Sequence, residues 1–185
     1  MKLAGNGQAK ILTTAELSQL FGEGLIKTRD RCLFAICLFT GCRISEALAL
    51  QKTDLKNKTI TFRKSTTKGK LKTRTVNTPL PLVEYLDQYA PPPNEYNPYL
   101  FPSREGKHLT RIMADKILRA ACKRIGIEGV STHSFRRTAL TQMHNAGIPL
   151  RHIQEISGHN DLGTLQRYLE VSPDQIEQAV SVIGW

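Results

Sequence analysis

The chain has 185 residues, 40% of them hydrophobic and 23% charged, values that are ordinary for a globular protein and sufficient for one compact core. Its 26 lysines and arginines outnumber 16 acidic residues, and the net charge of +10 favours a polyanionic partner, although charge alone also fits a basic protein without one. No apolar run approaches the ~20 residues of a membrane span, and no signal-peptide pattern opens the chain, so neither a membrane protein nor a secreted one is expected.

The positive charge is unevenly distributed along the chain. Residues 52–74 hold seven lysines and two arginines against one acid, whereas residues 170–185 hold three acids and no base. A dense basic segment is typical of a surface that faces phosphates. The middle of the chain is therefore predicted to meet nucleic acid, and its end is not.

Three of the four cysteines, Cys32, Cys37 and Cys42, stand five residues apart in one apolar, helix-like run. A step of five residues turns a helix by roughly 140° net, so neighbouring cysteines face different directions and do not form a metal site. No Cys-x-x-Cys pair is present. Buried, reduced thiols are expected, which fits a protein of the reducing cytoplasm that uses no metal or other cofactor.

The first third of the chain predicts helices. Residues 1–10 are small and polar and predict a flexible arm or the remnant of a linker. A capping box at 13–16 predicts a short helix that runs to Phe21 and is broken by the two glycines that follow. Residues 29–40 form a strongly apolar helical run, expected at the centre of the core, and a second helix resumes at 43–50 after a glycine.

The hydrophobic period then changes from helical to extended. Residues 59–63 and 71–76 alternate like strands, with a polar, lysine-rich tip at 65–70 between them. This pattern predicts a hairpin or part of a small sheet. Pro79 and Pro81 predict the start of another helix.

A loop, a buried anchor and a long helix follow. Residues 90–94 predict an extended polyproline loop, and residues 100–102 predict a short buried anchor. Residues 110–125 predict a helix that Thr110 caps. Its predicted inward residues are Ile112, Met113, Ile117, Leu118 and Ala121, and its other face carries Arg111, Lys116, Arg119, Lys123 and Arg124.

The C-terminal third is predicted to be helical throughout. A helix capped by Thr132 is expected at 133–145, a second at 149–157, a third from Asp161 through Tyr168, and a last one from Ser172. The whole pattern predicts an α+β class, mainly helical, with a small antiparallel sheet or hairpin.

Several residues that bind phosphate well recur in this part of the chain. His133 and Arg136 are three residues apart on one predicted helix and therefore share a face. Together with the distant Arg43, such a pair makes physical sense if a negative group lies between them. Arginine suits phosphate because its planar fork donates two hydrogen bonds and it does not deprotonate. With the Gly-His pair at 158–159 and Tyr168, these residues favour phosphodiester chemistry.

At these positions the chain resembles the tyrosine recombinases, or phage integrases. The segment 40–48, Thr-Gly-Cys-Arg-Ile-Ser-Glu-Ala-Leu, is similar to the family's first arginine box. The segment 133–137, His-Ser-Phe-Arg-Arg, is similar to its His-x-x-Arg box, and Gly-His at 158–159 followed by Tyr168 is similar to its third box. Three boxes in order at fitting separations are specific. The resemblance covers residues 11–170 and implies the tyrosine recombinase catalytic fold.

The resemblance also implies a role for each matching residue. Tyr168 would be the nucleophile, forming a 3′-phosphotyrosyl bond to DNA and freeing a 5′-hydroxyl. Arg43 and Arg136 would hold the non-bridging oxygens of the scissile phosphate, and His159 would add a hydrogen bond to them. His133 would help to position the phosphate and accept the tyrosine proton. Phosphoryl transfer depends mainly on positioning and charge, so no metal or ATP is expected.

Two further positions complete the expected site, and a third departs from the family's pattern. Lys68 would protonate the leaving 5′-oxygen, with Lys70 as the alternative, because the spacing to the Lys-x-Arg at 72–74 is one residue longer than the family's usual one. Glu46 would buttress the active-site arginines or the lysine. Ser157 stands where the family often has leucine, a difference expected to affect packing only.

Basic residues outside the boxes are candidate DNA contacts. They are Lys64, Lys70, Lys72, Arg74, Arg111, Lys116, Arg119, Lys123 and Arg137. Two interpretations of the basic residues on the helix at 110–125 stay open. They form either a solvated face or a face that lies against DNA.

The predicted function is that of a site-specific DNA recombinase of the integrase, excisionase or invertase type. Its expected partner is double-stranded DNA with a specific recombination site. The protein is expected to form a homotetramer on this DNA and to be a monomer when free. A type IB topoisomerase is the second hypothesis and a non-catalytic DNA-binding regulator on the same fold is the third. The expected setting is a prokaryotic or phage-encoded protein of the cytoplasm, associated with the nucleoid.

Both ends of the chain leave alternatives open. The family commonly has an N-terminal domain that clamps the other side of the DNA, and this chain fits an excised fragment or a natural single-domain member. Residues 171–185 predict a tail helix with an apolar stripe. This tail would pack either on its own domain or, as the resemblance suggests, on a neighbouring subunit.

Overall fold

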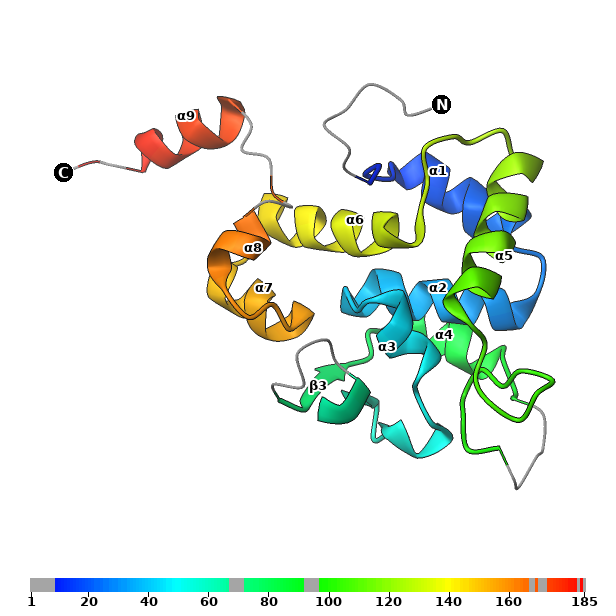
Figure 1. Ribbon diagram of the computed structural model, residues 1–185. Coiled ribbons are helices and arrows are strands. Elements are labelled where there is room, and N and C mark those ends of the chain that lie inside the picture. Colours follow the sequence, from blue (N-terminus) through cyan, green and yellow to red (C-terminus); the bar gives the residue numbers. More distant parts are fainter. Residues whose placement is uncertain are drawn as a thin grey trace.

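The computed structural model describes residues 9–66, 72–91, 97–166, 169, 173–182 and 184. The described helices are α1 (Thr14–Gln19), α2 (Thr28–Thr40), α3 (Ile44–Leu48), α4 (Leu80–Asp87), α5 (Arg111–Arg124), α6 (Thr132–Asn145), α7 (Leu150–Ser157), α8 (Leu162–Gln166) and α9 (Pro173–Ser181). The strands are β1 (Leu55–Lys56), β2 (Thr59–Phe62) and β3 (Arg74–Asn77), and short 3-10 turns cover Lys52–Asp54 and Lys64–Thr66. The predicted α+β class, mainly helical with a small antiparallel sheet, is confirmed (Figure 1).

Helix α2 forms the centre of the core, as predicted from its apolar sequence. Its residues Leu33, Phe34 and Ile36 have no exposed surface, and it contacts α3, α4 and α6. The ring of Phe34 stacks on Phe135 of α6 with centroids 4.9 Å apart. Fully burying a side chain of this size stabilises a fold by about 1.5–3 kcal/mol, so this contact is a main attachment between α2 and α6.

The first helix continues further than its sequence predicts. Thr13 caps α1 and forms the expected capping box with Glu16. Gly22 does not break the helix, which continues as a π turn over Leu20–Gly24. Gly22 lies in open space, whereas Gly24 is closely packed: a Cβ on Gly24 would lie 3.0 Å from Leu20 and 3.2 Å from Ile125 beside α5.

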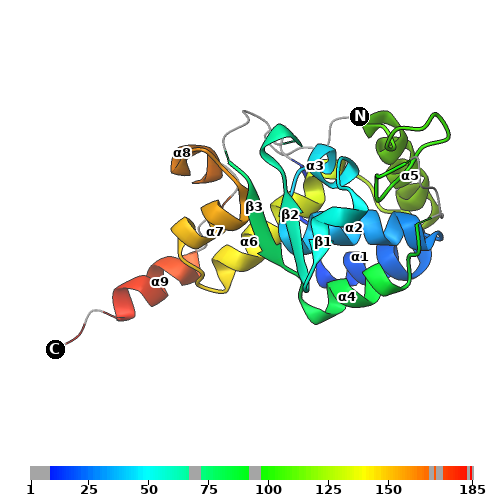
Figure 2. The same cartoon turned by 90° about the horizontal axis from the view of Figure 1, so that it is seen from below.

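The sheet has the order β1-β2-β3 and is antiparallel throughout. Strand β1 was not predicted, because it is two residues long and shows no alternation. A turn at Asn57 and Lys58, with φ of 49° and 57°, joins it to β2. The second predicted strand starts at Arg74 rather than at residue 71, and Arg74 pairs with Phe62. Figure 2 shows β3 beside α7, which it contacts.

Helix α5 has the predicted N-cap but a different buried face. The hydroxyl of Thr110 accepts a hydrogen bond from the Met113 amide. The prediction that Ile112 and Met113 point inward is wrong, since they are 70% and 46% exposed. The buried residues are Ala114, Leu118, Ala121 and Cys122. These four follow one helical stripe with the spacing i, i+4, i+7 and i+8, and Ile112 and Met113 lie outside it.

Helices α6, α7 and α8 pack against one another. The N-cap of α6 is Ser131, one residue earlier than predicted. A small second cluster of buried residues, Leu140, Ile153 and Leu165, packs one side chain from each of α6, α7 and α8 together. The three helices therefore form a unit beside the main core.

The predicted buried anchor and the buried cysteines are found in the structure. Leu100 and Phe101 are buried, which confirms the predicted anchor. The four cysteines are buried and not in disulfides, as predicted, and burial raises the pKa of Cys32 to about 12. The predicted N-terminal arm, hairpin tip and polyproline loop fall mostly on residues outside the described ranges. Within those ranges, every helix is too short or too polar for a membrane span.

Candidate active site

Arg136 lies at the centre of the candidate site and is 1% exposed. Its Nη1 donates to the carbonyl of Gly41 at 2.5 Å and to the carbonyl of Ser157 at 3.0 Å. These two carbonyls end α2 and α7, where helix dipoles concentrate negative charge. Burial, followed by the charge of Arg43, lowers the pKa of Arg136 to about 10, so the side chain stays protonated at neutral pH. One guanidinium thus holds two helix ends together.

His159 follows directly after α7 and faces Arg136. Gly158 ends the helix with φ +68°, a left-handed conformation that glycine adopts without strain and that turns the chain toward α6. Nη2 of Arg136 lies 2.9 Å from Nε2 and 3.2 Å from Nδ1 of the imidazole. The buried amide of Gln154 holds this turn by donating to the carbonyls of His159 and Asn160.

Ser157 contacts the imidazole of His159 as well. Its Oγ lies 2.7 Å from Nδ1 of His159 and donates to the carbonyl of Gln154. Because Arg136 can only donate, we assign Nε2 as the acceptor and Nδ1–H as the donor to Ser157. The expectation that Ser157 affects packing only is therefore wrong. The sequence shows a serine two residues before the histidine, but its burial and its contact with the ring appear only in the structure.

Burial and the neighbouring positive charges keep His159 neutral. Burial, followed by the positive charges of Arg136 and Arg43, lowers the pKa of His159 to about 3. An imidazole in this position accepts a hydrogen bond at neutral pH and has one N–H to donate.

Arg43 is joined to the same cluster through Glu46. Arg43 precedes α3, and its backbone amide donates to Oε2 of Glu46 at 2.7 Å. Its Nη1 lies 3.7 Å from Oε1 of Glu46, which is itself 1% exposed. Burial alone would raise the pKa of Glu46, but the hydrogen bonds and charge of Arg74 with the Arg43 amide lower it overall. An ionised Glu46 therefore orients the start of α3.

Two residues predicted to contact DNA are in the interior instead. Arg74 is 7% exposed and forms a two-pronged ion pair with Glu46, with Nη1–Oε1 and Nη2–Oε2 distances of 3.0 and 3.2 Å. Arg137 is also 7% exposed, and its Nη1 donates to the carbonyl of Ala9. Both guanidinium groups are enclosed by protein in this structure, which does not present them to DNA. Local sequence spacing gives no sign of partners this distant.

His133 lies in the first turn of α6 and has an exposed side chain. Partial burial, followed by the charges of Arg136, Arg111 and Arg43, lowers its pKa. The neutral form is therefore favoured at neutral pH, and this form can accept a proton. The structure thus brings four of the six expected catalytic residues, Arg43, His133, Arg136 and His159, into one electrostatically connected group.

The remaining basic candidates are exposed. On α5 these are Arg111, Lys116, Arg119 and Lys123. Arg119 forms an ion pair with Asp115 at 2.8 Å, and Arg124, also exposed, donates to the carbonyl of Gly24. On the sheet side, Lys64 and Lys72 are exposed, and Lys72 forms an ion pair with Glu155 of α7.

Three expected site residues, Lys68, Lys70 and Tyr168, lie outside the described residues. Leu169, directly after Tyr168, packs against the cluster that joins α6, α7 and α8. Within the described ranges, no three histidine, cysteine, aspartate or glutamate side chains gather closely enough to hold a metal ion.

Known proteins with similar sequences show the family of this chain. The sequence model of the phage integrase family matches residues 10–175. The chain belongs to the phage integrase family. The tyrosine recombinase XerC of Herpetosiphon aurantiacus is 31% identical over 182 residues, which cover 90% of this chain and 57% of that protein. Tyrosine recombinase XerA of Pyrococcus furiosus is 32% identical over 161 residues, covering 83% and 54%.

This phage integrase family member spans little more than half the length of these two relatives. A relative of similar length is the probable integrase/recombinase YoeC of Bacillus subtilis, which is 32% identical over 158 residues, covering 84% of this chain and 85% of YoeC.

Solved structures agree with the family assignment. The crystal structure of XerA recombinase has a TM-score of 0.77 at 24% identity, covering 94% of this chain and 64% of that one. The catalytic domain of bacteriophage HP1 integrase has a TM-score of 0.66 at 24% identity, covering 94% and 95%. XerH recombinase bound to its difH substrate has a TM-score of 0.72 at 27% identity, covering 93% and 54%. The predicted tyrosine recombinase catalytic fold is confirmed.

Proposed function

We propose that this chain is the catalytic part of a site-specific recombinase that cleaves and rejoins double-stranded DNA through a 3′-phosphotyrosyl intermediate. The observation that carries the proposal is the convergence of Arg43, Arg136 and His159, from three distant segments, on one cationic cluster beside His133. Fixed cations of this kind stabilise the charge of a phosphoryl transfer without a metal. Relatives named as recombinases, and XerH solved with a difH substrate, support it.

The proposed reaction balances without a cofactor. The Tyr168 oxygen attacks the scissile phosphorus and loses its proton to neutral His133 while the bond from phosphorus to the 5′-oxygen breaks. Lys68, or Lys70 in the alternative, gives a proton to the leaving 5′-oxygen. Arg43 and Arg136 hold the non-bridging oxygens. The phosphotyrosyl bond conserves the energy of the broken bond, so rejoining by a 5′-hydroxyl needs no ATP.

Substrate binding must change the partners of Arg136. Its guanidinium is 1% exposed and bonded to two carbonyls and His159. We propose that a phosphate oxygen takes the place of the His159 ring as the acceptor for Nη2, because an anion accepts more strongly than a neutral imidazole. His159 then bonds the same phosphate as its Nε2–H tautomer, in which Nδ1 accepts from the Ser157 hydroxyl.

The first step of the experiment identifies the DNA sequence that the protein cleaves. The protein is incubated with a pool of nicked duplexes whose central sequence is randomised, so that the short 5′-hydroxyl fragment diffuses away after cleavage. Protein–DNA adducts that survive denaturing detergent are isolated and sequenced. We expect one recovered sequence, which then serves as the substrate for every later assay.

Three outcomes of this assay decide between the hypotheses. Covalent adducts with the wild-type protein and none with Tyr168→Phe support the proposal. Adducts that persist in Tyr168→Phe contradict the assignment of the nucleophile, and no adduct from the pool contradicts the enzyme hypothesis and leaves the non-catalytic regulator. Relaxation of supercoiled plasmids that lack the recovered sequence would favour a type IB topoisomerase.

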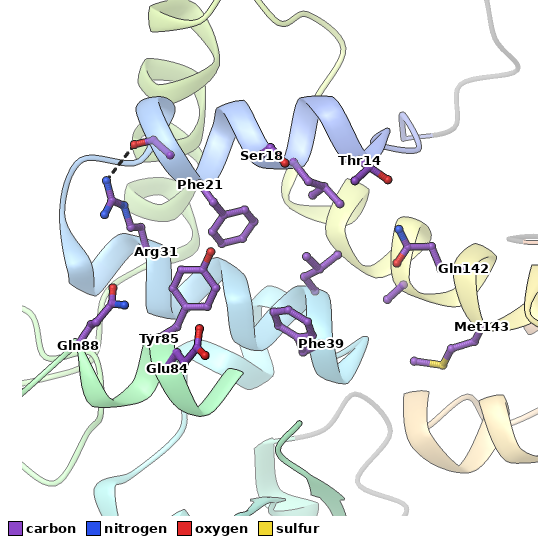
Figure 3. A pocket seen from close by; sticks show the side chains of 14 residues that line it. Thr14, Ser18, Phe21, Arg31, Phe39, Glu84, Tyr85, Gln88, Gln142 and Met143 are labelled. Atoms are coloured by element: carbon purple, nitrogen blue, oxygen red, sulfur yellow. Dashed lines mark hydrogen bonds between the residues drawn. The ribbon is translucent and has the colours of Figure 1, made fainter. Parts of the chain in front are cut away.

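We further propose that the active form is a homotetramer on DNA, in the cytoplasm, and that α9 packs on a neighbouring copy. Figures 1 and 2 show α9 projecting from the body, and its Ile176 and Val180 are 59% and 62% exposed. A groove of about 700 Å³ between α1, α2, α4 and α6 is a suitable acceptor, since Phe21 and Phe39 line it (Figure 3). An exposed apolar stripe on a short helix is typical of an interface.

The assembly proposal is tested on the recovered site. Ile176→Asp should leave the free protein monomeric and reduce the tetramer on DNA to smaller species, measured by sedimentation. Glu177→Gln, on the same helix but outside the apolar stripe, is the matched control. Tetramers that form equally well with Ile176→Asp would show that α9 packs on its own domain.

A further inference from the structure

Arg74 lies at the junction of three segments of the site. It starts β3, and its two terminal nitrogens bond both carboxylate oxygens of Glu46 on α3. Its Nε donates to the carbonyl of Ile156, in the last turn of α7, at 3.0 Å. One buried side chain therefore joins the sheet, α3 and α7.

The pocket around Arg74 fits a planar guanidinium on all sides. The group lies 4.2 Å from the centroid of the Phe62 ring, in a cation–π arrangement. On another side, a Cβ placed on Gly158 would lie 3.1–3.4 Å from three atoms of Arg74, so a larger residue there would displace the guanidinium. A lysine has its three donors on one nitrogen and cannot reproduce bonds that Arg74 makes from three separate nitrogens, two to Glu46 and one to Ile156.

Each partner of Arg74 is bonded to an expected catalytic residue or lies beside one in the chain. Glu46 accepts from the backbone amide of Arg43. Ile156 immediately precedes Ser157, whose carbonyl bonds Arg136, and Gly158, which precedes His159. The two sides of the proposed phosphate site are thus both fixed against the same guanidinium.

We propose that Arg74 is a positioning residue that sets the placement of Arg43 relative to His159 and Arg136, and so determines the rate of DNA cleavage rather than DNA affinity. This inference rests on the proposed recombinase function. Arg74 does not touch the phosphate in this arrangement; it acts through Glu46 and the end of α7. A displacement on the order of 1 Å in such a site lowers a reaction rate by roughly 100-fold.

A buried ion pair that only stabilises the fold would look similar in the structure, so the experiment separates the two roles. Removing one partner leaves an unpaired buried charge, whereas removing both leaves a neutral pocket that can fold. The first test variant is therefore the double substitution Arg74→Met and Glu46→Gln. The second is Arg74→Lys, which keeps a positive charge beside Glu46 but loses the fork.

The chain offers a matched control in the same sheet. Arg63, next to β2, pairs with Asp54 at 3.1 Å and donates to the carbonyl of Ala49. The double substitution Arg63→Met and Asp54→Asn removes an arginine–carboxylate pair from the same part of the fold, one whose arginine is more exposed than Arg74. It leaves Glu46, α7 and the bonds of Arg74 in place.

Three quantities are measured for each protein on the recovered substrate: the melting temperature, the Kd for DNA, and the single-turnover rate of adduct formation at saturating protein. For both Arg74 variants we expect a rate loss of roughly 100-fold with an unchanged Kd, including when the melting temperature matches that of the control. The control should cleave at the wild-type rate.

The possible failures are distinguishable. If wild-type protein forms no adduct, the recombinase proposal fails. If wild type cleaves and both Arg74 variants cleave as fast as the control, only the positioning role is overturned. A double variant that does not fold leaves the decision to Arg74→Lys, for which a wild-type rate also overturns the inference.

Discussion

The buried arginines of the site and the exposed basic face of α5 carry the same charge in opposite environments. Arg74 and Arg136 are 7% and 1% exposed, and carbonyls, a carboxylate and a histidine fix their guanidinium groups. Lys116 and Lys123 on α5 are exposed to solvent. A buried, bonded cation acts through its geometry, whereas an exposed one acts through long-range attraction that salt screens.

This difference explains why basic residues so close in the sequence separate into two functions. Lys72 and Arg74 are two positions apart, yet Lys72 lies on the surface with Glu155 and Arg74 lies beneath it with Glu46. Substitutions in the buried set should change the rate of cleavage and the stability. Substitutions in the exposed set should change DNA affinity and its dependence on salt.

The largest effect is expected for Arg136→Lys. All donors of a lysine lie on one nitrogen, so it cannot hold the carbonyls of Gly41 and Ser157 and also reach the phosphate position that Nη2 of Arg136 serves, and the single-turnover rate should fall by at least roughly 100-fold. The carbonyls left without a partner should also lower the unfolding free energy by about 1–3 kcal/mol. Kd for DNA should change little, as measured by fluorescence anisotropy. Equal losses of binding and cleavage would break the proposed division between the two sets.

Glu46→Gln should be the next largest, and it acts on stability. It leaves Arg74 buried without a counter-charge, which costs on the order of 3 kcal/mol at neutral pH. Because the folded-state pKa of Glu46 lies below its ordinary 4.5, its stabilisation is present above pH 4.5 and is lost as the pH falls further. Urea unfolding between pH 7 and pH 3 checks this: wild type should lose its advantage over Glu46→Gln below pH 4.5.

His159 should give an acid response in a different pH window. Its folded pKa is about 3 against an ordinary 6.5, so below pH 6.5 the unfolded state binds a proton that the folded state does not. Stability should therefore fall as the pH decreases from 6.5 toward 3, by at most about 1.4 kcal/mol per pH unit from this group. The unfolding free energy of His159→Gln should depend less on pH between 6.5 and 5. The Glu46→Gln variant is the control, because it should retain the wild-type slope there.

The smallest effects are expected on α5. Lys116→Ala or Lys123→Ala should weaken DNA binding and reduce the slope of log Kd against log salt by about 1 for each phosphate that the variant no longer neutralises. Arg119→Ala should change it less, because Asp115 already offsets that charge. The cleavage rate at saturating protein should not change. A lysine variant that slows cleavage at saturation would place α5 in the catalytic machinery.

The boundaries of most elements were predictable, because hydrophobic period and capping residues act over a few neighbouring positions. Thr13, Thr110 and Gly41 end or begin helices where their local chemistry requires it. The prediction failed for Ile112 and Met113, whose apolar side chains are exposed. Which stripe of α5 is buried depends on the neighbours that it meets, and these are not local.

For the candidate site, the types of the reacting residues could be read from three short motifs, because their spacing is set along single helices and turns. Which arginines are buried, and what they bond, followed from the three-dimensional arrangement alone. The contacts that decide it join Arg74 to Glu46 across 28 positions, Arg74 to Ile156 across 82, and Arg136 to Gly41 across 95. The local structural propensity of an arginine does not show whether its guanidinium lies on the surface or in the core. Its role is therefore set by the carbonyls and carboxylates that the fold brings within hydrogen-bonding distance.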